Sequence, residues 1–247
     1  MLERLPTRVE REPVVGAGLG GDDTTAIDQA AEDVILARLR AAAGAVVSEE
    51  IGRVGAGLPL VVVDPIDGSL NAKRGIPFFS LSVAVAEGEM MDDVVFGFVH
   101  DFGSREEWTA RRGEGAWLND EPLGAVLPKE EVEILSFEAT RTSLVAQEAP
   151  KVAELAHRLR IMGSLALSLC HLAAGRVDAV CSLKPARSVD IAAAQLLCRE
   201  LGLAVDLFDV EERFAAALLD LEQRSRVVAA GSEAVCSRIA AALRGEA

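Results

Sequence analysis

Apolar residues in the early part of the chain follow two different periods. Between residues 25 and 43 they recur at helical spacing, which predicts one amphipathic helix. Two short runs rich in β-branched residues follow, at 45–48 and 60–63. The second run is apolar at every position, which is typical of a strand covered on both faces of a sheet. We therefore expect a buried central strand that ends at residue 63.

The middle of the chain and its second half are patterned differently from each other. Alternating apolar and polar residues from 76 to 118 predict a β-meander with hairpin turns. After a polar stretch at 121–131, helical and strand periods alternate up to residue 243. This mixture predicts an α+β protein of layered sheets and helices rather than a barrel. In the second half we expect strands at 132–138, 159–162, 177–182, 203–208 and 226–230, and helices at 143–158, 164–174, 188–201 and 232–243.

The polar stretch at 121–131, which contains Pro122 and Pro128, is the one candidate boundary that the pattern offers. It separates an N-terminal α+β half, residues 1–125, from a C-terminal α/β half, residues 126–247. A chain of 247 residues can bury one full core, or a core shared by two fused halves. We expect the two halves to form one compact unit.

Charge and composition exclude several classes of protein. The chain has 39 acidic and 25 basic residues and a net charge of −14. Nucleic acids and anionic membranes require a positive surface, so we expect neither as a partner. No apolar run reaches the roughly 18 residues of a membrane-spanning helix, and the charged start of the chain does not resemble a secretory signal. The spacing of the four cysteines fits neither a zinc ribbon nor a redox pair, which indicates buried, reduced thiols in a cytoplasmic protein.

The segment 64–69, with the sequence DPIDGS, directly follows the predicted buried strand. Two carboxylates three positions apart would point to opposite faces of a regular strand. Because Pro65 fixes φ and Gly68 permits a turn, we expect both carboxylates to converge instead. Polar groups at the carboxyl end of a central strand are where open sheets bind ligands. An ordinary surface turn is the alternative interpretation.

Two more acidic clusters lie at the ends of apolar elements. Glu49 and Glu50 follow a short strand, and Asp190 begins an otherwise apolar helix, where it could also serve as a simple helix cap. Oxygen ligands without a neighbouring histidine or cysteine favour Mg²⁺ or Mn²⁺ over zinc. Three such clusters are typical of a metal-dependent phosphoryl hydrolase, and we expect water to be its nucleophile.

A glycine-rich stretch at 16–21 formally matches the G-x-G-x-x-G pattern of dinucleotide-binding turns. That turn needs a strand before it and a helix that begins directly after it. Here the preceding apolar run is very short and the predicted helix begins late. We favour a flexible active-site flap, and a plain loop or a dinucleotide turn remain the alternatives.

Taken together, these motifs resemble the inositol monophosphatase superfamily in order and spacing, from about residue 14 to residue 244. The short length and the Glu-Glu-Ile-Gly sequence are most similar to the archaeal enzymes that act on both fructose 1,6-bisphosphate and inositol 1-phosphate. The resemblance implies an α+β fold, the layered αβαβα sandwich of the sugar phosphatases, and a homodimer. The segments that carry it are IDQAAE at 27–32, SEEIG at 48–52, DPIDGS at 64–69 and VDIAA at 189–193.

The resemblance also implies the roles of individual residues. Glu49 and the Ser69 hydroxyl, itself hydrogen-bonded to Asp28, would orient the attacking water. Asp67 and the backbone N–H groups of Gly68 and Ser69 would contact the substrate, with the N–H groups around its phosphate. Two or three Mg²⁺ ions, or Mn²⁺ in their place, would be held by Glu49, Asp64, the Ile66 carbonyl, Asp67 and Asp190.

The expected substrate is a phosphate monoester of a small sugar or polyol, such as fructose 1,6-bisphosphate or inositol 1-phosphate. A second phosphate requires cations, for which Lys184, Arg187 and Arg160 are the candidates, although each could be a solvated loop charge. Ser164 could donate to a sugar hydroxyl or cap its helix. Two other functions stay open: a phosphatase for 3′-phosphoadenylated nucleotides, and a regulatory family member without turnover.

Overall fold

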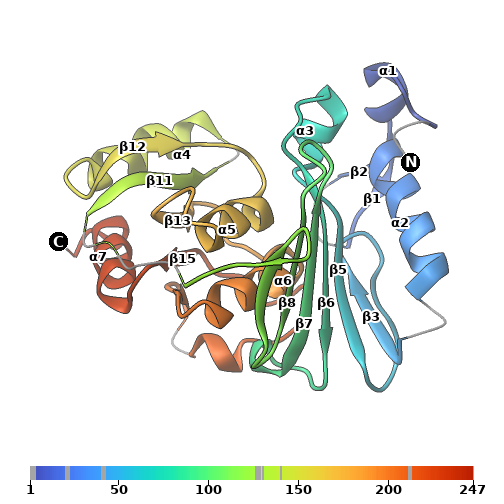
Figure 1. The fold of residues 1–247 in the computed structure, drawn as a ribbon. Helices are drawn as coiled ribbons and strands as arrows, with labels where there is room; N and C mark the ends of the chain where they lie inside the picture. The colour runs from blue at the N-terminus through green and yellow to red at the C-terminus, as the bar shows by residue number, and fades with distance from the viewer. Residues whose placement is uncertain are drawn as a thin grey trace.

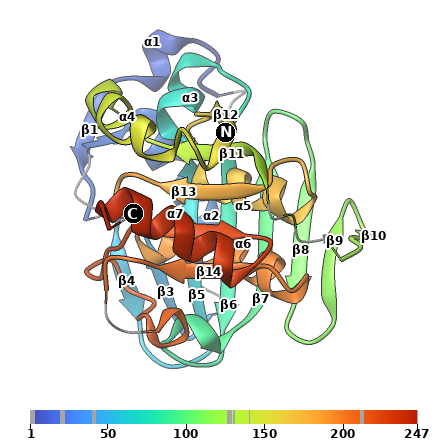
Figure 2. The ribbon, with the colours of Figure 1, turned by 90° about the vertical axis from the view of Figure 1, so that its left-hand side faces the viewer.

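The computed structural model describes residues 4–19, 23–39, 43–125, 129, 131–139, 141–210 and 213–246. Within these residues, helices and two mixed sheets alternate in five layers (Figures 1 and 2). The predicted layered α+β fold is confirmed. From one side to the other, the layers are α2 (Ala26–Leu39), an eight-stranded sheet, the helices α5 (Leu165–Ala173) and α6 (Ser188–Glu200), a five-stranded sheet, and α7 (Glu233–Arg244).

The larger sheet has the strand order β10-β9-β8-β7-β6-β5-β3-β4. All its neighbouring strands are antiparallel except β3 and β5, which are parallel. Alternate residues of β6 are buried against the central helices, as the predicted meander requires. The strands are β3 (Ala45–Ser48), β4 (Gly52–Gly55), β5 (Leu60–Asp67), β6 (Ser80–Ala86), β7 (Val94–Asp101), β8 (Glu107–Arg111), β9 (Gly115–Leu118) and β10 (Glu121–Pro122).

The smaller sheet has the strand order β12-β11-β13-β15-β14, in which β11 is parallel to both of its neighbours. The carboxyl ends of β11 and β13 therefore lie at the same end of this sheet. The helices α5 and α6 separate this sheet from the larger one (Figure 1). The strands are β11 (Val132–Glu138), β12 (Ala156–Arg160), β13 (Ala179–Ser182), β14 (Ala204–Leu207) and β15 (Val227–Ala230).

The helix predicted at 143–158 is wrong in its second half. The structure has α4 (Thr142–Glu148), a single 3₁₀ segment η2 (Ala149–Val152), and then the edge strand β12. Pro150 explains the difference, because proline has no N–H and its ring clashes with the preceding turn in a helix interior. The strand that we expected at 159–162 therefore begins three residues earlier and spans Ala156–Arg160.

Buried side chains from both halves of the chain form one core between the two sheets. Val62 and Trp108 from the first half pack in the same cluster as Leu197 and Val227 from the second. Burying a side chain of this size stabilises the fold by roughly 2 kcal/mol. The two halves therefore share their largest core, although the division at residue 125 itself remains a prediction.

Gly16 and Ala17, the first residues of the glycine-rich stretch, end β1 (Val14–Ala17), which pairs with β2 (Asp23–Thr25) in a separate two-stranded sheet. Residues 20–22 are outside the described part, and the predicted flap lies partly there. A dinucleotide turn follows a strand of a parallel sheet, so that alternative is wrong. No helix in the described residues is long and apolar enough to cross a membrane, and the four cysteines are free and buried. The short elements are α1 (Arg8–Arg11), α3 (Ser69–Arg74), η1 (Met91–Asp93) and η3 (Phe214–Ala216).

Candidate active site

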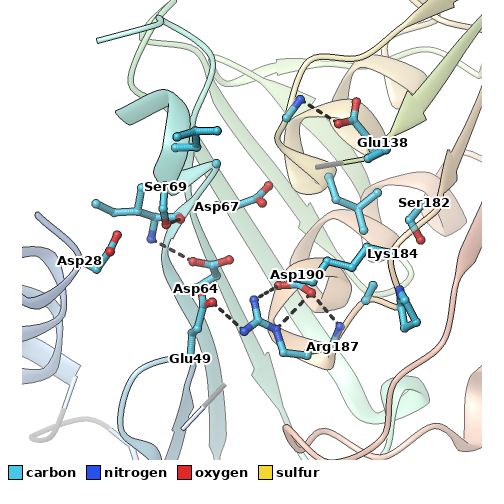
Figure 3. Close-up of a pocket in the computed structure, with 18 of the residues that line it drawn as sticks. Asp28, Glu49, Asp64, Asp67, Ser69, Glu138, Ser182, Lys184, Arg187 and Asp190 are labelled. Carbon is cyan, nitrogen blue, oxygen red and sulfur yellow. Dashed lines mark hydrogen bonds and ion pairs between the residues drawn. The ribbon is translucent and has the colours of Figure 1, made fainter. Parts of the chain in front are cut away.

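The end of β5 brings two carboxylates to one side of the sheet. The strand continues four residues beyond its predicted end, and its register with β6 shifts between Asp64 and Asp67. This irregularity adds one residue to β5 and offsets the normal alternation of faces. Pro65, which cannot donate a ladder hydrogen bond, lies within it. Both carboxylates consequently line the same pocket, as expected from the sequence (Figure 3).

That pocket has a volume of about 420 Å³ and opens between the two halves of the chain. Its lining comes from the end of β5, the turn after β3, the start of α3 and the start of α6 (Figure 3). Most of the predicted site residues are therefore brought together. They are Asp28, Glu49, Asp64, Ile66, Asp67, Gly68, Ser69, Lys184, Arg187 and Asp190.

Ser164 supports Asp67 rather than lining the pocket. Its hydroxyl lies 2.5 Å from Asp67 Oδ2, which also accepts a hydrogen bond of 2.7 Å from the backbone N–H of Ala166. The Ser164 oxygen in turn accepts a hydrogen bond from the N–H of Leu167, so it caps α5. Of the two predicted roles for Ser164, the structure shows the helix cap.

The predicted hydrogen bond between Ser69 and Asp28 is absent from the described contacts. The Ser69 hydroxyl donates instead to the Ile66 carbonyl, at 3.0 Å, because the first turn of α3 carries it back over the end of β5. Asp28 Oδ2 accepts from the backbone N–H and the hydroxyl of Thr25. Asp28 Oδ1 is buried without a hydrogen-bond partner. Both side chains still line the pocket, so their predicted part in orienting water remains open.

Arg160 does not reach the pocket. It is the last residue of the edge strand β12, its side chain is exposed, and its guanidinium donates to the carbonyl of the adjacent Leu159 at 2.9 Å. The sequence placed it just before the loop that leads to α5. Arg160 is not among the described residues that line the pocket, so it is not supported as a substrate ligand.

Sequence reasoning missed several lining residues, of which Glu138 is the most informative. It ends β11, and its carboxylate accepts hydrogen bonds from the Gly163 N–H at 2.8 Å and the Ser168 hydroxyl at 2.7 Å. These bonds hold the loop and the helix that position Asp67. A polar residue at the end of a predicted strand was the available signal. The other polar or charged side chains in the lining to which the sequence assigned no role are Asp23, Glu50, Lys73 and Ser182.

The burial of the central carboxyl groups changes their acidity. It raises the pKa of Glu49 and that of Asp67, each to about 7, and it raises the pKa of Asp64 well above its ordinary value. Neighbouring carboxylates add to the increase at all three sites. Hard oxygen donors that are strained by mutual repulsion fit a divalent cation such as Mg²⁺.

Arg187 lies among these carboxylates. Its guanidinium is 2.6 Å from Glu49 Oε1 and 2.9 Å from Asp190 Oδ1 (Figure 3). Within the described residues, no three acidic, histidine or cysteine side chains stand close enough to hold one ion in this arrangement. The carboxylate oxygens are suitable ligands for a metal ion, but Arg187 lies between two of the carboxylates, Glu49 and Asp190.

The family of the chain follows from comparison with known proteins. A profile of the inositol monophosphatase family matches residues 7–246. The chain belongs to this family. A relative from Thermococcus kodakarensis, named fructose-1,6-bisphosphatase/inositol-1-monophosphatase, is 34% identical over 94% of this chain and 87% of its own length. The resemblance inferred from the motifs is confirmed.

Solved structures agree with the family assignment. One, named inositol monophosphatase-fructose 1,6 bisphosphatase, matches with a TM-score of 0.83 and 28% identity, over 98% of this chain and 93% of the other. Another is a hypothetical protein from Pyrococcus horikoshii with similarities for inositol-1 monophosphatase. It matches with a TM-score of 0.82 and 27% identity, over 98% of this chain and 91% of the other.

The raised pKa values predict how pH and Mg²⁺ affect stability. Carboxyl groups titrate near 4 in an unfolded chain, whereas Glu49 and Asp67 titrate at about 7 when folded. Between these values the folded, metal-free protein binds more protons than the unfolded chain, so its stability falls as pH rises. We expect saturating Mg²⁺ to raise the melting temperature about twice as much at about pH 8 as at about pH 6. Scanning calorimetry with Mg²⁺ and with chelator measures this, and equal gains at both pH values would contradict it.

Proposed function

We propose that this protein hydrolyses a phosphate monoester of a small sugar or polyol, with Mg²⁺ as cofactor. The observation that carries the proposal is the convergence of Glu49, Asp64, Asp67 and Asp190 on one pocket at the junction of the two halves. The relatives named fructose-1,6-bisphosphatase/inositol-1-monophosphatase support fructose 1,6-bisphosphate and inositol 1-phosphate as the substrates.

The chemistry of the donors supports a specific ligand set for the cofactor. Glu49 and Asp64 with the Ile66 carbonyl would hold one ion, while Asp64, Asp67 and Asp190 would hold the second. A third, weaker ion would bind near Glu49, and Mn²⁺ has the same preference for oxygen. Mg²⁺ bound there would lower the pKa of a water molecule and offset the charge of the phosphate.

Around these ligands, the protein groups would position the two reacting partners. Glu49, Asp28 and the Ser69 hydroxyl line this pocket and would orient the attacking water. The backbone N–H groups of Gly68 and Ser69 would hold the phosphate oxygens. Asp67 lines the pocket and is held in place by Ser164 and Ala166, which both donate to its Oδ2. Fixed positions of this kind supply much of the rate in phosphoryl transfer.

Lys184 is the residue that we propose for the second phosphate of a bisphosphate. It lines the pocket beside the start of α6. A hydrogen bond to a charged group contributes about 1.5–3 kcal/mol, so Lys184→Gln should raise KM for fructose 1,6-bisphosphate about tenfold. KM for inositol 1-phosphate should stay within about twofold. Steady-state kinetics on both substrates test this, and equal increases would remove Lys184 from the role.

The matched control is Lys129→Gln. Lys129 forms an ion pair of 2.7 Å with Asp178 and is not among the pocket residues. Its replacement removes the same charge from the protein, so we expect no change in the ratio of the two KM values. A comparable shift in the control would show that net charge, rather than a contact, causes the effect.

The two alternative functions have less support in the structure. An adenylated substrate needs a stacking platform, and none of the described residues that line the pocket is aromatic. A regulatory member without turnover has no need to keep four acidic side chains together in one pocket, where their repulsion costs stability. The geometry therefore favours a sugar or polyol phosphatase.

The direct test is phosphate release from inositol 1-phosphate and from fructose 1,6-bisphosphate, each with Mg²⁺ and with chelator. We expect release from both that depends on Mg²⁺. Release from neither, by folded protein that binds Mg²⁺, would contradict the proposal. Release of the 3′-phosphate from an adenylated nucleotide in the same assay would favour the first alternative.

Two further properties are proposed, the first from the family resemblance and the second from the cysteines. One is a homodimer, which light scattering on the purified protein checks directly. The other is a cytoplasmic location, supported by Cys170, Cys181, Cys198 and Cys236, which are all buried free thiols, as expected in a reducing compartment.

A further inference from the structure

The pocket concentrates negative charge that must be compensated even before a metal arrives. Eight acidic side chains line it, four of which are the proposed metal ligands, and the cations among its described lining residues are Lys73, Lys184 and Arg187. Lys73 lies on the side of Asp28, with its Nζ 4.0 Å from Asp28 Oδ2. Arg187 is the cation that contacts two of the proposed metal ligands.

Arg187 connects the two halves of the chain through these contacts. Glu49 belongs to the turn after β3, and Asp190 lies in the first turn of α6. One guanidinium nitrogen, Nη1, is 2.6 Å from Glu49, and the other, Nη2, is 2.9 Å from Asp190 (Figure 3). The Arg187 side chain is 9% exposed. An arginine guanidinium is always charged, so a permanent cation already neutralises part of the site.

Arg187 and a Mg²⁺ ion would compete for these two carboxylates, because Arg187 already contacts Glu49 Oε1 and both oxygens of Asp190. A Mg²⁺ ion requires ligands at about 2.0–2.1 Å in near-octahedral geometry, and a guanidinium at hydrogen-bond distance from both Glu49 and Asp190 occupies the space between them. An ion bound between these carboxylates would therefore displace the guanidinium from at least one of these contacts.

We propose that Arg187 is a built-in counter-ion that closes the metal site in the metal-free protein and competes with the divalent cation. The proposal rests on the proposed metal-dependent function. When ions take Glu49 and Asp190, the released guanidinium stays in the pocket and becomes available to a phosphate group of the substrate. This order explains how one residue can serve both a carboxylate pair and the phosphate contact expected from the sequence.

The competition has a measurable size. If the bridged form makes up about nine-tenths of metal-free molecules, the apparent Kd for the ion is about tenfold weaker than that of an open site. Arg187→Gln removes the charge and the bridge, so Mg²⁺ should bind about tenfold more tightly. In chelator the same variant should melt on the order of 5 °C lower, because the buried carboxylates lose their partner.

The test is calorimetric titration of MgCl₂ into chelator-treated wild type, Arg187→Gln and Arg187→Lys, with melting temperatures in chelator. Arg187→Lys keeps the charge but cannot reach both carboxylates as a planar fork, so its Mg²⁺ affinity should lie between the other two. Lys129→Gln is the control: it removes one positive charge outside the pocket, from the ion pair with Asp178, so its Mg²⁺ affinity should stay close to that of wild type.

The Mg²⁺ affinities and melting temperatures of these variants distinguish the proposal from its alternatives. Tighter Mg²⁺ binding and a lower melting temperature in Arg187→Gln support the proposal. Unchanged or weaker binding in this variant, while wild type binds Mg²⁺, would overturn it and leave the proposed metal site standing. Absence of Mg²⁺ binding to every variant would overturn both.

A second titration examines the released state, with inorganic phosphate as the probe and saturating Mg²⁺ present. Wild type should bind phosphate about tenfold more tightly than Arg187→Gln, as expected for the loss of one charged hydrogen-bond donor. Equal phosphate affinities would overturn the transfer of Arg187 from the carboxylates to the substrate.

Discussion

Asp67→Asn should reduce kcat/KM by on the order of 1,000-fold or more while leaving the fold intact. The change removes one charge from the proposed metal site, and metal ions supply several kcal/mol of transition-state stabilisation, of which each 1.4 kcal/mol is a factor of ten in rate. The fold should survive, because an amide oxygen can replace Asp67 Oδ2 as acceptor for the Ser164 hydroxyl and the Ala166 N–H. Phosphate release under saturating Mg²⁺ measures the loss of kcat/KM, and a thermal melt shows whether the fold is intact.

Asp101→Asn is the matched control for this variant. Asp101 is 3% exposed and ends β7, where its carboxylate accepts from the Gly103 N–H at 2.7 Å and the Ser104 hydroxyl at 2.7 Å. It is a buried carboxylate with neutral donors, like Asp67, but it does not line the pocket. We expect activity close to wild type. Wild-type activity in Asp67→Asn would contradict the metal assignment.

Gly68→Ala should be the most damaging single-methyl change near the site. Gly68 has φ +92°, and an added Cβ would lie 3.0 Å from the Gly163 carbonyl and 3.2 Å from the Phe78 carbonyl. The left-handed backbone costs about 1–2 kcal/mol for a residue with a side chain, and overpacking adds about 1–3 kcal/mol. We expect a loss of about 3 kcal/mol in the free energy of unfolding, measured by urea denaturation. Displacement of the neighbouring Asp67 and Ser69 should lower kcat on the order of 100-fold.

Gly75→Ala separates the two causes. Gly75 follows α3 with φ +73°, but among the described residues an added Cβ would meet only the Arg11 side chain, at 3.8 Å. Gly75→Ala therefore has the cost of a left-handed backbone without steric crowding. We expect it to lose about 1 kcal/mol in the free energy of unfolding and to keep near-normal activity. If both variants lost the same stability, the close approach between Gly68 and the Gly163 loop would have no energetic importance.

The segment 64–69 was predictable because its chemistry is local. Pro65 and Gly68 have restricted or special backbone conformations, and their positions relative to the buried strand indicate where the chain must bend. The bend appears as the register shift between Asp64 and Asp67. The same local logic identified Glu49 and Asp190, since each is an acid at the end of an apolar element.

Contacts that depend on topology could not be predicted in the same way. Glu138 is one acid at the end of one strand, and its importance appears only when β11 and α5 are seen to be neighbours. The prediction that Arg160 contacts the substrate lacked support for a similar reason: its position at the end of the edge strand β12, where its side chain is exposed, depends on how the chain folds. The ion pair between Arg187 and Glu49 joins residues distant in sequence, so only the folded chain reveals it.

The central claim is that carboxylates from both halves of the chain hold divalent cations in this pocket. Anomalous scattering from crystals of the wild-type protein grown with Mn²⁺ tests it most directly. We predict at least two anomalous peaks, one within bonding distance of Glu49 and Asp64 and one within bonding distance of Asp64, Asp67 and Asp190. Peaks confined to other parts of the surface, with Arg187 still between Glu49 and Asp190, would contradict the claim.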